Sequence, residues 1–357
     1  MAVAPICLQA PQNLRLLQPP ARVGRRHAAG AGPRGARTSH GPRPYGRHSD
    51  ERVERTRRAG AWPPRGTPAF TVRERLEAPR RVRAGASGGG NDGRDALLKP
   101  GDVVLVAGAT GGVGQLLCAK LLERGYRVIA LSRNASKTRS LLGSDVENLS
   151  VVTGDLRSPA SLAKIDWSVV NAVCCCTGTT AFPSKRWDND NTPEQTDLVA
   201  NKNLIGAALK GQALKRFVLC TSAGVERSGQ FPFLILNLFG VLKYKRMAEE
   251  LLEDSGLPYT IVRPNRLCDG PYTSYDLNTL LKGVAGERQD IILTRQDDQV
   301  GETSRIAVAE SMVQSLTSPA CVDATFSIGS VKLDGDGGNA PGQDEGKWHA
   351  LFDKLLA

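Results

Sequence analysis

Short apolar runs alternate with segments of helical spacing from residue 102 onward. Val103–Ala107 is an apolar run bounded by turn residues, which is typical of a strand buried in a parallel sheet. In Gly112–Arg124 apolar residues recur every three or four positions, as on one face of a helix. The alternation continues with strands expected at Arg127–Ser132, Leu149–Thr153, Val169–Cys176, Arg216–Thr221 and Tyr259–Val262, and helices at Ser136–Leu142, Asp197–Gln212 and Gly240–Ser255. This order predicts an α/β fold with a doubly wound parallel sheet.

The pattern loosens after Tyr272. We expect helices near Leu277–Lys282 and Ala307–Leu316, and strands at Ile291–Leu293 and Thr325–Ile328. These elements are interpreted as a small C-terminal lobe over the carboxyl edge of the sheet. Residues 100–330 then form the folded domain, and residues 331–357 form a polar tail with a terminal helix at Lys347–Leu356.

Residues 1–95 differ from the rest of the chain in charge. They contain 19 Arg, no Lys and 7 acidic residues, a net charge of +12, and the first acidic residue is Asp50. An Arg-rich, acid-poor N-terminus is typical of an organellar transit peptide, and such a composition cannot bury enough apolar surface to fold alone. We therefore expect a disordered transit peptide and linker, cleaved between about residues 45 and 90, with a plastid or a mitochondrial address. A disordered basic arm that binds RNA is the alternative.

The remainder of the chain is balanced in charge. Residues 96–357 hold 28 Lys or Arg and 29 Asp or Glu, so nothing indicates a nucleic-acid-binding surface on the mature protein. None of the eight Cys has CxxC spacing, and we expect no metal site. Cys174–Cys176 lie in an apolar run, where thiols act as small hydrophobic side chains; a redox-sensing thiol is the alternative. No apolar run approaches the ~18 residues of a membrane-spanning helix.

A glycine-rich loop follows the first strand directly. Residues 108–114 read Gly-Ala-Thr-Gly-Gly-Val-Gly and lead into the first helix. Glycines at these positions permit a tight turn, close approach of the backbone to a pyrophosphate, and contact between helix and strand, while the helix N-terminus attracts phosphate. The predicted sheet is therefore of the Rossmann type, with a dinucleotide bound at this loop. The loop residues assigned to the cofactor are Gly108, Thr110, Gly111, Gly112, Val113 and Gly114.

The end of the second strand indicates which dinucleotide binds. Arg133 stands 19 residues after Gly114, where an acidic residue would bind the ribose 2′-hydroxyl of NAD. A guanidinium can instead grip a 2′-phosphate, so NADP(H) is favoured over NAD(H), with a solvated surface arginine as the alternative. After the third strand, Asp155 and Leu156 are assigned to the adenine side. The Asp155 carboxylate would accept a hydrogen bond from the adenine amino group or cap the helix that starts near Ser158.

Together these motifs resemble the atypical short-chain dehydrogenases of the NmrA-like, NAD(P)-binding type, and in particular plastid-targeted members from plants and algae. The resemblance covers about residues 102–330, and it implies that the transit peptide directs the protein to the chloroplast stroma. It rests on GATGGVG at 108–114, LSR at 131–133, GDL at 154–156, NLIGAA at 203–208, FVLCTSAGV at 217–225, KYKRMAEELLEDSGLPYTIVRP at 243–264 and IAVAE at 306–310.

The resemblance implies catalytic positions, one of which departs from the family pattern. The wider superfamily uses a Ser, a Tyr and a Lys four residues after the Tyr. Ser222 matches the Ser, and Lys245 matches the Lys that holds the nicotinamide ribose. Val241 occupies the position of the Tyr and cannot transfer a proton. Tyr244 precedes the Lys, but on a helix it would point about 100° away.

Two further segments are expected near the substrate. Thr177 follows the fourth strand and would face the nicotinamide ribose, and Pro264–Arg266 would form another pocket wall. Lys185–Trp187 is interpreted either as a lid over an anionic or aromatic substrate or as a solvated loop. Phe231–Phe239 carries one polar residue in nine, and we interpret it as a core helix, with an exposed partner- or membrane-docking face as the alternative.

Two functions follow from this pattern. The first is an NADP-dependent plastid oxidoreductase acting on a small carbonyl or quinone-like substrate. The second is a non-catalytic NADP-binding regulatory or assembly factor, peripherally associated with a thylakoid or envelope complex. The phosphate loop fits both functions, and Val241 favours the second.

Overall fold

The computed structural model describes residues 97–267, 289–298, 301–332 and 342–356. The described residues all belong to one compact unit, Ala69–Ala357. The expectations for residues 1–95 and for a helix at Leu277–Lys282 lie outside the described residues.

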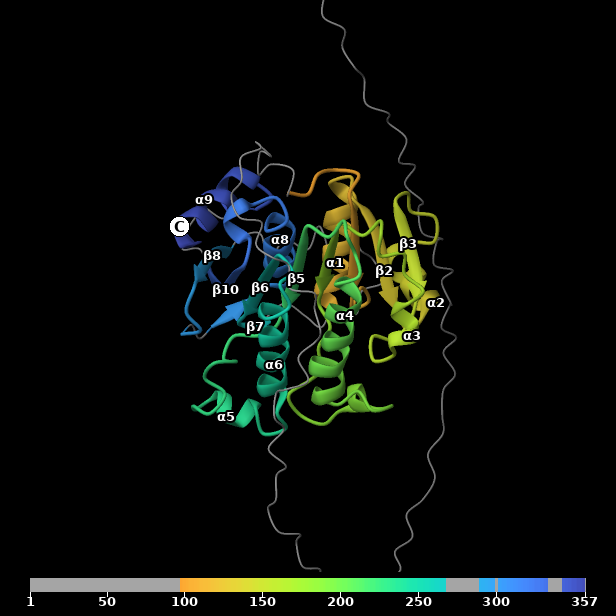
Figure 1. The fold of residues 1–357 in the computed structure, drawn as a ribbon. Coiled ribbons are helices and arrows are strands. Elements are labelled where there is room, and N and C mark those ends of the chain that lie inside the picture. Colours follow the sequence, from red (N-terminus) through yellow and green to blue (C-terminus); the bar gives the residue numbers. More distant parts are fainter. Residues whose placement is uncertain (1–96, 268–288, 299–300, 333–341, 357) are drawn as a thin grey trace, which may run out of the picture. The chain divides into compact units, whose positions relative to one another are not determined.

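Strands and helices alternate through the first half of the fold (Figure 1). The strands are β1 (Val103–Ala107), β2 (Arg127–Ser132), β3 (Leu149–Thr153), β4 (Ala172–Cys175), β5 (Arg216–Cys220), β6 (Tyr259–Pro264), β7 (Arg266–Leu267), β8 (Gln289–Thr294), β9 (Glu302–Thr303) and β10 (Ala324–Lys332). The α-helices are α1 (Gly112–Glu123), α2 (Ala135–Leu142), α3 (Pro159–Leu162), α4 (Ala200–Ala208), α5 (Phe233–Leu236), α6 (Val241–Glu253), α8 (Arg305–Gln314) and α9 (Glu345–Leu356). Two 3₁₀ turns, η2 (Lys185–Trp187) and η4 (Pro319–Cys321), and a π-helical segment, η3 (Glu194–Val199), complete the described elements.

The strands form one sheet in the order β3-β2-β1-β4-β5-β6-β10-β9-β7, with β8 paired to β10. Pairing is parallel from β3 through to β10. The chain moves outward from β1 in opposite directions, to β2 on one side and to β4 on the other. Ligands in such sheets bind outside the carboxyl ends of the strands at this switch point. The carboxyl ends of β1 and β4 are adjacent there, with Ala107 opposite Cys175.

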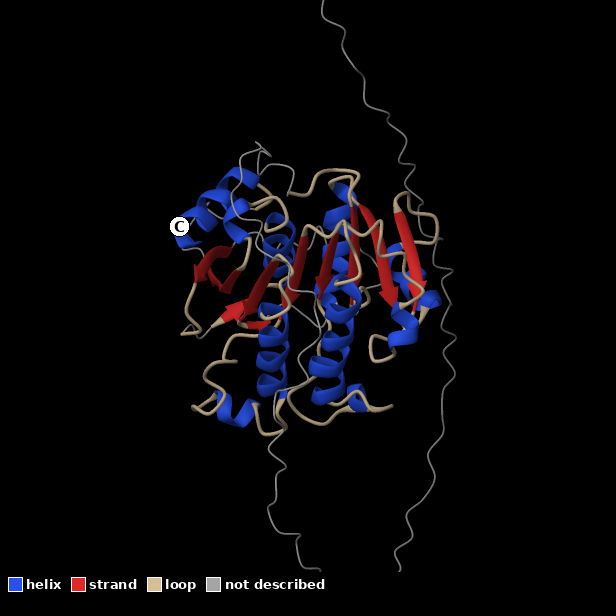
Figure 2. Ribbon diagram, viewed as in Figure 1, coloured by secondary structure: helices blue, strands red, loops and turns tan. Residues whose placement is uncertain are grey.

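Helices cover both faces of the sheet (Figure 2), because alternate residues of each buried strand point to opposite sides. In β1, Val104 and Val106 face the cluster formed with α1 and α8, while Leu105 and Ala107 face the cluster formed with α4. All four side chains are fully buried. This burial on both faces explains why the strands read as uninterrupted apolar runs in the sequence.

A buried ion pair joins α1 to α8, on the face of the sheet that these two helices cover. Lys120 and Glu310 approach to 2.8 Å and are both almost completely buried, and Arg124 also pairs with Glu310. Removing one partner of such a pair leaves an uncompensated charge in the interior. The pair therefore ties α1, which starts at the glycine loop, to a helix from the far end of the chain.

The Rossmann-type doubly wound sheet is confirmed, but the C-terminal part differs from the expectation. Its described strands extend the sheet instead of covering the carboxyl edge, because β10 pairs in parallel with β6 and antiparallel with β8. Phe326, Ser327 and Ile328 of β10 are fully buried, which places this strand inside the sheet. The terminal helix is present as α9, and its Trp348 and Phe352 pack into the core.

Two helices near the carboxyl edge also differ from the expectation. In place of one helix at Asp197–Gln212, the chain forms the π-helical segment η3 and then α4, which ends at Ala208. The core-helix interpretation of Phe231–Phe239 is wrong. The helix is limited to α5, and only Phe233 of its apolar residues is buried, whereas Phe231 is 78% and Leu238 is 70% exposed.

The start of α6 explains why α5 is short. The side chain of Asn237 accepts hydrogen bonds from the backbone N–H groups of Leu242 and Lys243, at 3.0 Å each, and so begins α6. Gly240 adopts a left-handed conformation (φ +80°) that ends the preceding turn. The residues between are therefore held at the surface.

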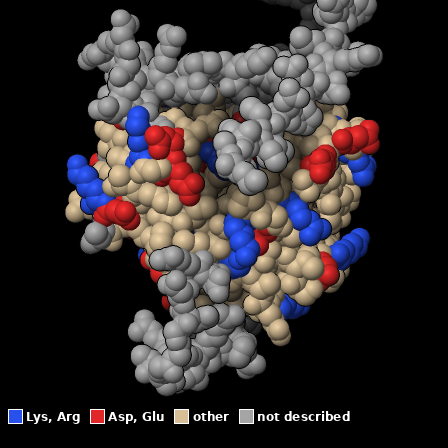
Figure 3. Space-filling model, turned by 90° about the horizontal axis from the view of Figure 1, so that it is seen from above, with Lys and Arg blue, Asp and Glu red and all other residues tan. Residues whose placement is uncertain are grey.

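Charged side chains of both signs are mixed on the face seen in Figure 3. Lys and Arg side chains stand among Asp and Glu side chains over the described part of this face, without forming one continuous basic stripe. This agrees with the balanced charge of residues 96–357.

Candidate functional site

The glycine loop packs its backbone against the end of β4. Gly108 has a left-handed conformation (φ +82°), and a Cβ atom there would lie 3.0 Å from backbone atoms of Cys176 and Thr177. A Cβ on Gly114 would lie 2.2 Å from the carbonyl oxygen of Gly108. No side-chain cap occupies the N-terminus of α1, which follows Gly111, so its first amide groups are available to an anion. Only glycine fits at the first and last positions of this loop.

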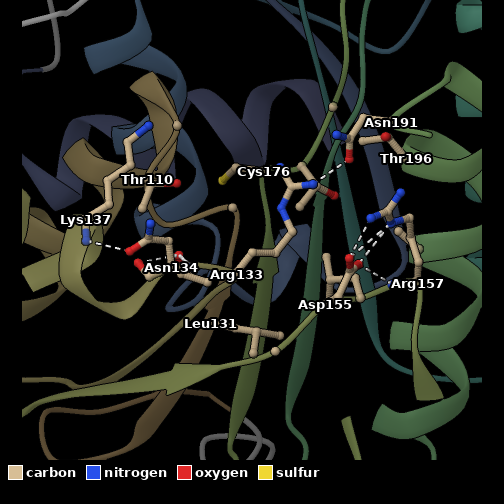
Figure 4. A pocket seen from close by; sticks show the side chains of 18 residues that line it. Thr110, Leu131, Arg133, Asn134, Lys137, Asp155, Arg157, Cys176, Asn191 and Thr196 are labelled. Carbon is tan, nitrogen blue, oxygen red and sulfur yellow. Dashed lines mark hydrogen bonds and ion pairs between the residues drawn. The ribbon is translucent and has the colours of Figure 1, made fainter. Parts of the chain in front are cut away.

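A cavity of about 290 Å³ opens beside the loop (Figure 4). It is lined by the ends of β1, β2, β3 and β4 and by the segment that leads into α4. The lining residues are Gly108, Thr110, Gly111, Leu131, Ser132, Arg133, Asn134, Lys137, Gly154, Asp155, Leu156, Arg157, Cys176, Thr177, Gly178, Asn191, Thr196 and Ala200. The cavity brings together most of the residues assigned to the cofactor from the sequence. Gly112, Val113 and Gly114 instead form the first turn of α1.

Arg133 points into this cavity from the end of β2 (Figure 4). Its guanidinium donates a hydrogen bond to the side-chain oxygen of Asn191, from the segment between β4 and η3. Lys137 lines the same cavity from the first turn of α2. The Asn134 side chain caps this turn by accepting a hydrogen bond from the Lys137 amide at 2.9 Å. Two cationic side chains therefore stand at the position where the sequence predicted a 2′-phosphate.

A third cation, Arg157, was missed in the sequence. Its guanidinium holds the Asp155 carboxylate through several hydrogen bonds, the shortest 2.7 Å, and also donates to the carbonyl oxygens of Asn189 and Asp190 at 2.8 and 3.0 Å. Hydrogen bonds from the Arg157 side chain lower the pKa of Asp155 below its usual value. The helix-capping interpretation of Asp155 is wrong, because Asp155 accepts from the Arg157 amide while Ser158 precedes α3. Its contact with adenine stays a prediction.

Lys245 lies behind the cavity wall at Gly178. Its Nζ donates to Oδ1 of Asp197 at 2.7 Å, with the Lys245 side chain 12% exposed and Asp197 fully buried. A Cβ on Gly178 would lie 3.0 Å from Nζ and 3.4 Å from Oδ1. Burial disfavours the charge of Lys245, but Asp197 outweighs this and raises the pKa of Lys245. Asp197, in η3, is a second site residue that the sequence did not reveal.

The other positions of the expected catalytic set do not line the cavity, and a catalytic role of Ser222 stays a prediction. Ser222 donates its hydroxyl to the carbonyl oxygen of Ala223 at 3.0 Å. Val241 is buried at the start of α6, packed in a small apolar cluster. Tyr244 donates to Glu194 at 3.4 Å, and it does not line the cavity. Val241 therefore occupies the position of the superfamily Tyr without replacing its chemistry.

The cysteines at the end of β4 behave as the sequence predicted. Cys174 and Cys175 are fully buried, and Cys176 is partly buried in the cavity wall. Burial raises the pKa of all three thiols, so the thiolate form is disfavoured. Among the described residues no cluster of His, Cys, Asp and Glu could hold a metal ion, and no helix there is long and apolar enough to cross a membrane.

Comparison with known proteins decides the family. Residues 108–319, more than half of the chain, match the model of the NAD(P)H-binding family. The chain belongs to this family. The resemblance to atypical short-chain dehydrogenases that the sequence motifs indicated is thereby confirmed.

Two relatives show how far the likeness extends. The chloroplastic protein TIC 62 of Arabidopsis thaliana is 35% identical over 237 residues, which are 62% of this chain and 34% of that protein. This chain thus matches only about a third of the length of that curated relative. Sanguinarine reductase of Eschscholzia californica is 29% identical over 64% of this chain and 88% of that enzyme.

A solved structure agrees with the fold. A putative NAD-dependent epimerase/dehydratase from Bacillus halodurans superposes with a TM-score of 0.52 and 24% identity, covering 71% of this chain and all of that chain. At this identity the likeness supports the Rossmann-type architecture and not a particular reaction.

Substitution of Gly114 tests the tight packing of the loop. Gly114→Ala should lower the affinity for NAD(P)H at least about tenfold, because the new Cβ forces the Gly108 carbonyl out of place. Gly206→Ala is the matched control, since nothing lies within 4 Å of its Cβ position in α4. Titration of the nicotinamide fluorescence of NADH and of NADPH measures the affinities of both variants. Equal affinities for the two variants would contradict the account of the loop.

Proposed function

We propose that this protein binds NADP(H) in the cavity beside the glycine loop and acts as an NADP(H)-dependent oxidoreductase on a small carbonyl or quinone-like substrate. The observation that carries the proposal is the pair of cations, Arg133 and Lys137, at the β2 end of a cavity that the glycine loop also lines. No carboxylate follows β2 to bind a ribose 2′-hydroxyl, since Ser132 leads directly to Arg133 and Asn134. NAD(P) binding by the family supports the same assignment.

The residues present fit a phosphorylated dinucleotide. Gly108, Gly111 and the N-terminus of α1 leave room and amide donors for a pyrophosphate. Arg133 would hold the 2′-phosphate, exchanging its hydrogen bond with Asn191 for a stronger charge-assisted one. Thr177 and Gly178 line the far side of the cavity, where Lys245 would hold the nicotinamide ribose. Bound NADPH would supply the hydride, and the chain would orient it and exclude water.

A charge reversal at Arg133 tests the choice of cofactor. Arg133→Asp should weaken NADPH binding about a hundredfold, because a carboxylate would face the 2′-phosphate, and should change NADH binding much less. Arg139→Asp, an exposed arginine of α2 outside the cavity, is the control. Calorimetric titration with both cofactors gives the ratio. Equal losses for NADPH and NADH would show that Arg133 does not bind that phosphate.

A second candidate function is favoured by two observations. Val241 removes the superfamily proton donor, and an exposed apolar surface, here called the α5 patch, lies between β5 and α6. The α5 patch consists of Phe231, Leu234, Ile235, Leu236, Leu238 and Phe239, joined by edge-on ring contacts of Phe239 with Phe182 and Trp187. Exposed Lys185, Arg186 and Lys243 flank it, and no acidic residue occurs between Glu226 and Glu249. These properties fit peripheral attachment of a non-catalytic NADP-binding factor to an anionic membrane surface.

Turnover and vesicle binding distinguish the two candidates. The oxidoreductase predicts that NADPH oxidation is stimulated by at least one compound in a panel of small carbonyls and quinones, and that Lys245→Ala slows it at least about tenfold. Tight NADPH binding without turnover for every compound would favour the second candidate. In that case the protein should co-sediment with vesicles of anionic lipid, and Leu238→Asp should abolish this while Val322→Asp, an exposed apolar residue after η4, should not.

We also propose a plastid location. The relative TIC 62 is chloroplastic, and the Arg-rich residues 1–95 have the composition of a transit peptide. Mass spectrometry of the protein recovered from isolated chloroplasts should give a mature N-terminus between residues about 45 and 90. Recovery of the intact Arg-rich segment would contradict the proposal.

A further inference from the structure

The geometry points to Asp197 as a positioning residue that fixes and charges Lys245 for the cofactor's nicotinamide ribose. This inference rests on the proposed binding of NADP(H). It assigns a role to a residue that lies outside the glycine loop and outside the superfamily's Ser, Tyr and Lys positions.

The contacts of Lys245 set its direction. Nζ has three N–H groups, and one of them donates to Oδ1 of Asp197 at 2.7 Å. Among the described residues no other acceptor lies within hydrogen-bond distance of Nζ, so two donors are left for a ligand. Gly178 lines the cavity, and a Cβ on it would lie 3.0 Å from Nζ, so the missing side chain keeps the space beside the ammonium group open to a ligand.

Asp197 is itself held rigidly. It lies in η3, whose wider π-helical turn shifts its side chain relative to that of a regular helix, a feature often found at functional sites. The Asn201 side chain donates to the Asp197 carbonyl oxygen at 2.8 Å, and Asn201 Oδ1 accepts from Cys175 at the end of β4. The same cysteine contacts the hydroxyl of Thr177 at 3.1 Å. The backbone of Asp197 is thus tied through Asn201 to the strand end that forms the cavity wall.

The second carboxylate oxygen of Asp197 indicates that this residue does more than fill space in the core. Oδ2 is buried and has no hydrogen-bond partner among the described residues. Keeping a partly unsatisfied carboxylate in the interior is costly, and Lys245 is the charge that offsets it. Burial raises the pKa of Asp197, while Lys245 and the Thr179 amide act in the opposite direction.

The charge of Lys245 depends on this carboxylate. The titratable groups that face Lys245 from other elements are Asp197 of η3 and the thiols of Cys175 and Cys220 at the ends of β4 and β5. The thiols are neutral because burial raises the pKa of each. Without the Asp197 charge, burial alone would act on Lys245 and lower its pKa. The protonated amine would then be lost as the pH rises, and with it the charge-assisted hydrogen bonds to the ribose hydroxyls.

Paired ligands separate this role from a general effect on the fold. NADPH reaches both ends of the proposed site, whereas 2′,5′-ADP carries the 2′-phosphate and adenosine but no nicotinamide ribose. Asp197→Asn preserves shape and removes the charge. It should weaken NADPH about tenfold at pH 7.5, with a further loss toward pH 9.5, and leave 2′,5′-ADP unchanged. The wild-type protein and Asp188→Asn, an exposed control on the same segment, should show no such pH dependence.

A double-mutant cycle shows whether Asp197 acts through Lys245. Lys245→Met should weaken NADPH without pH dependence over this range, and adding Asp197→Asn should cause no further loss. Additive losses, an equal loss for 2′,5′-ADP, or unchanged NADPH binding by Asp197→Asn would each overturn the inference. If the wild-type protein binds neither ligand, the proposed function fails and the inference fails with it. If the wild-type protein binds both and Asp197→Asn behaves as wild type, only the inference fails.

Discussion

The close approach of two backbone segments governs the rest of this structure. The loop at Gly108 meets the chain leaving β4 at Cys176 with no space for a side chain, and α1, which begins at Gly112, packs against the same loop at Gly114. This contact sets where the strand ends of β1 and β4 lie relative to the N-terminus of α1. It thereby creates both the concave floor of the cavity and the group of amides that faces it. Every further feature of the site is placed against this floor.

The two ends of the site differ in net charge. At the β2 end, Arg133 and Lys137 present positive charge, and the described hydrogen bond of Arg133 goes to the uncharged amide of Asn191, as suits a site for phosphate. At the β4 end, Lys245 is paired with a fully buried carboxylate, so the local charge is close to balanced. A group with little net charge, such as a ribose, is better matched there than a second phosphate. The buried Val241 adds no proton donor at this end.

Much of the fold and of the phosphate loop could be predicted from sequence because both depend on local patterns. Buried strands read as apolar runs, and the glycine spacing reports a steric requirement that the structure shows directly at Gly108. Asp197 and Arg157 could not be found in this way, since their roles depend on contacts across 48 and 32 residues of chain. The C-terminal lobe was misplaced for the same reason, because the position of β10 beside β6 is a long-range pairing. The prediction of a core helix at Phe231–Phe239 was wrong because the segment has the apolar composition of a core helix, whereas Asn237 and Gly240 limit the helix to one turn.

The central claim is that this cavity takes a 2′-phosphorylated nicotinamide dinucleotide. Calorimetric competition on the wild-type protein tests it most directly, with NADPH, NADH and 2′,5′-ADP as ligands. The account predicts saturable one-to-one binding of NADPH, displacement of NADPH by 2′,5′-ADP, and an affinity for NADH at least about tenfold weaker. Equal affinity for NADH and NADPH, or no displacement by 2′,5′-ADP, would contradict it.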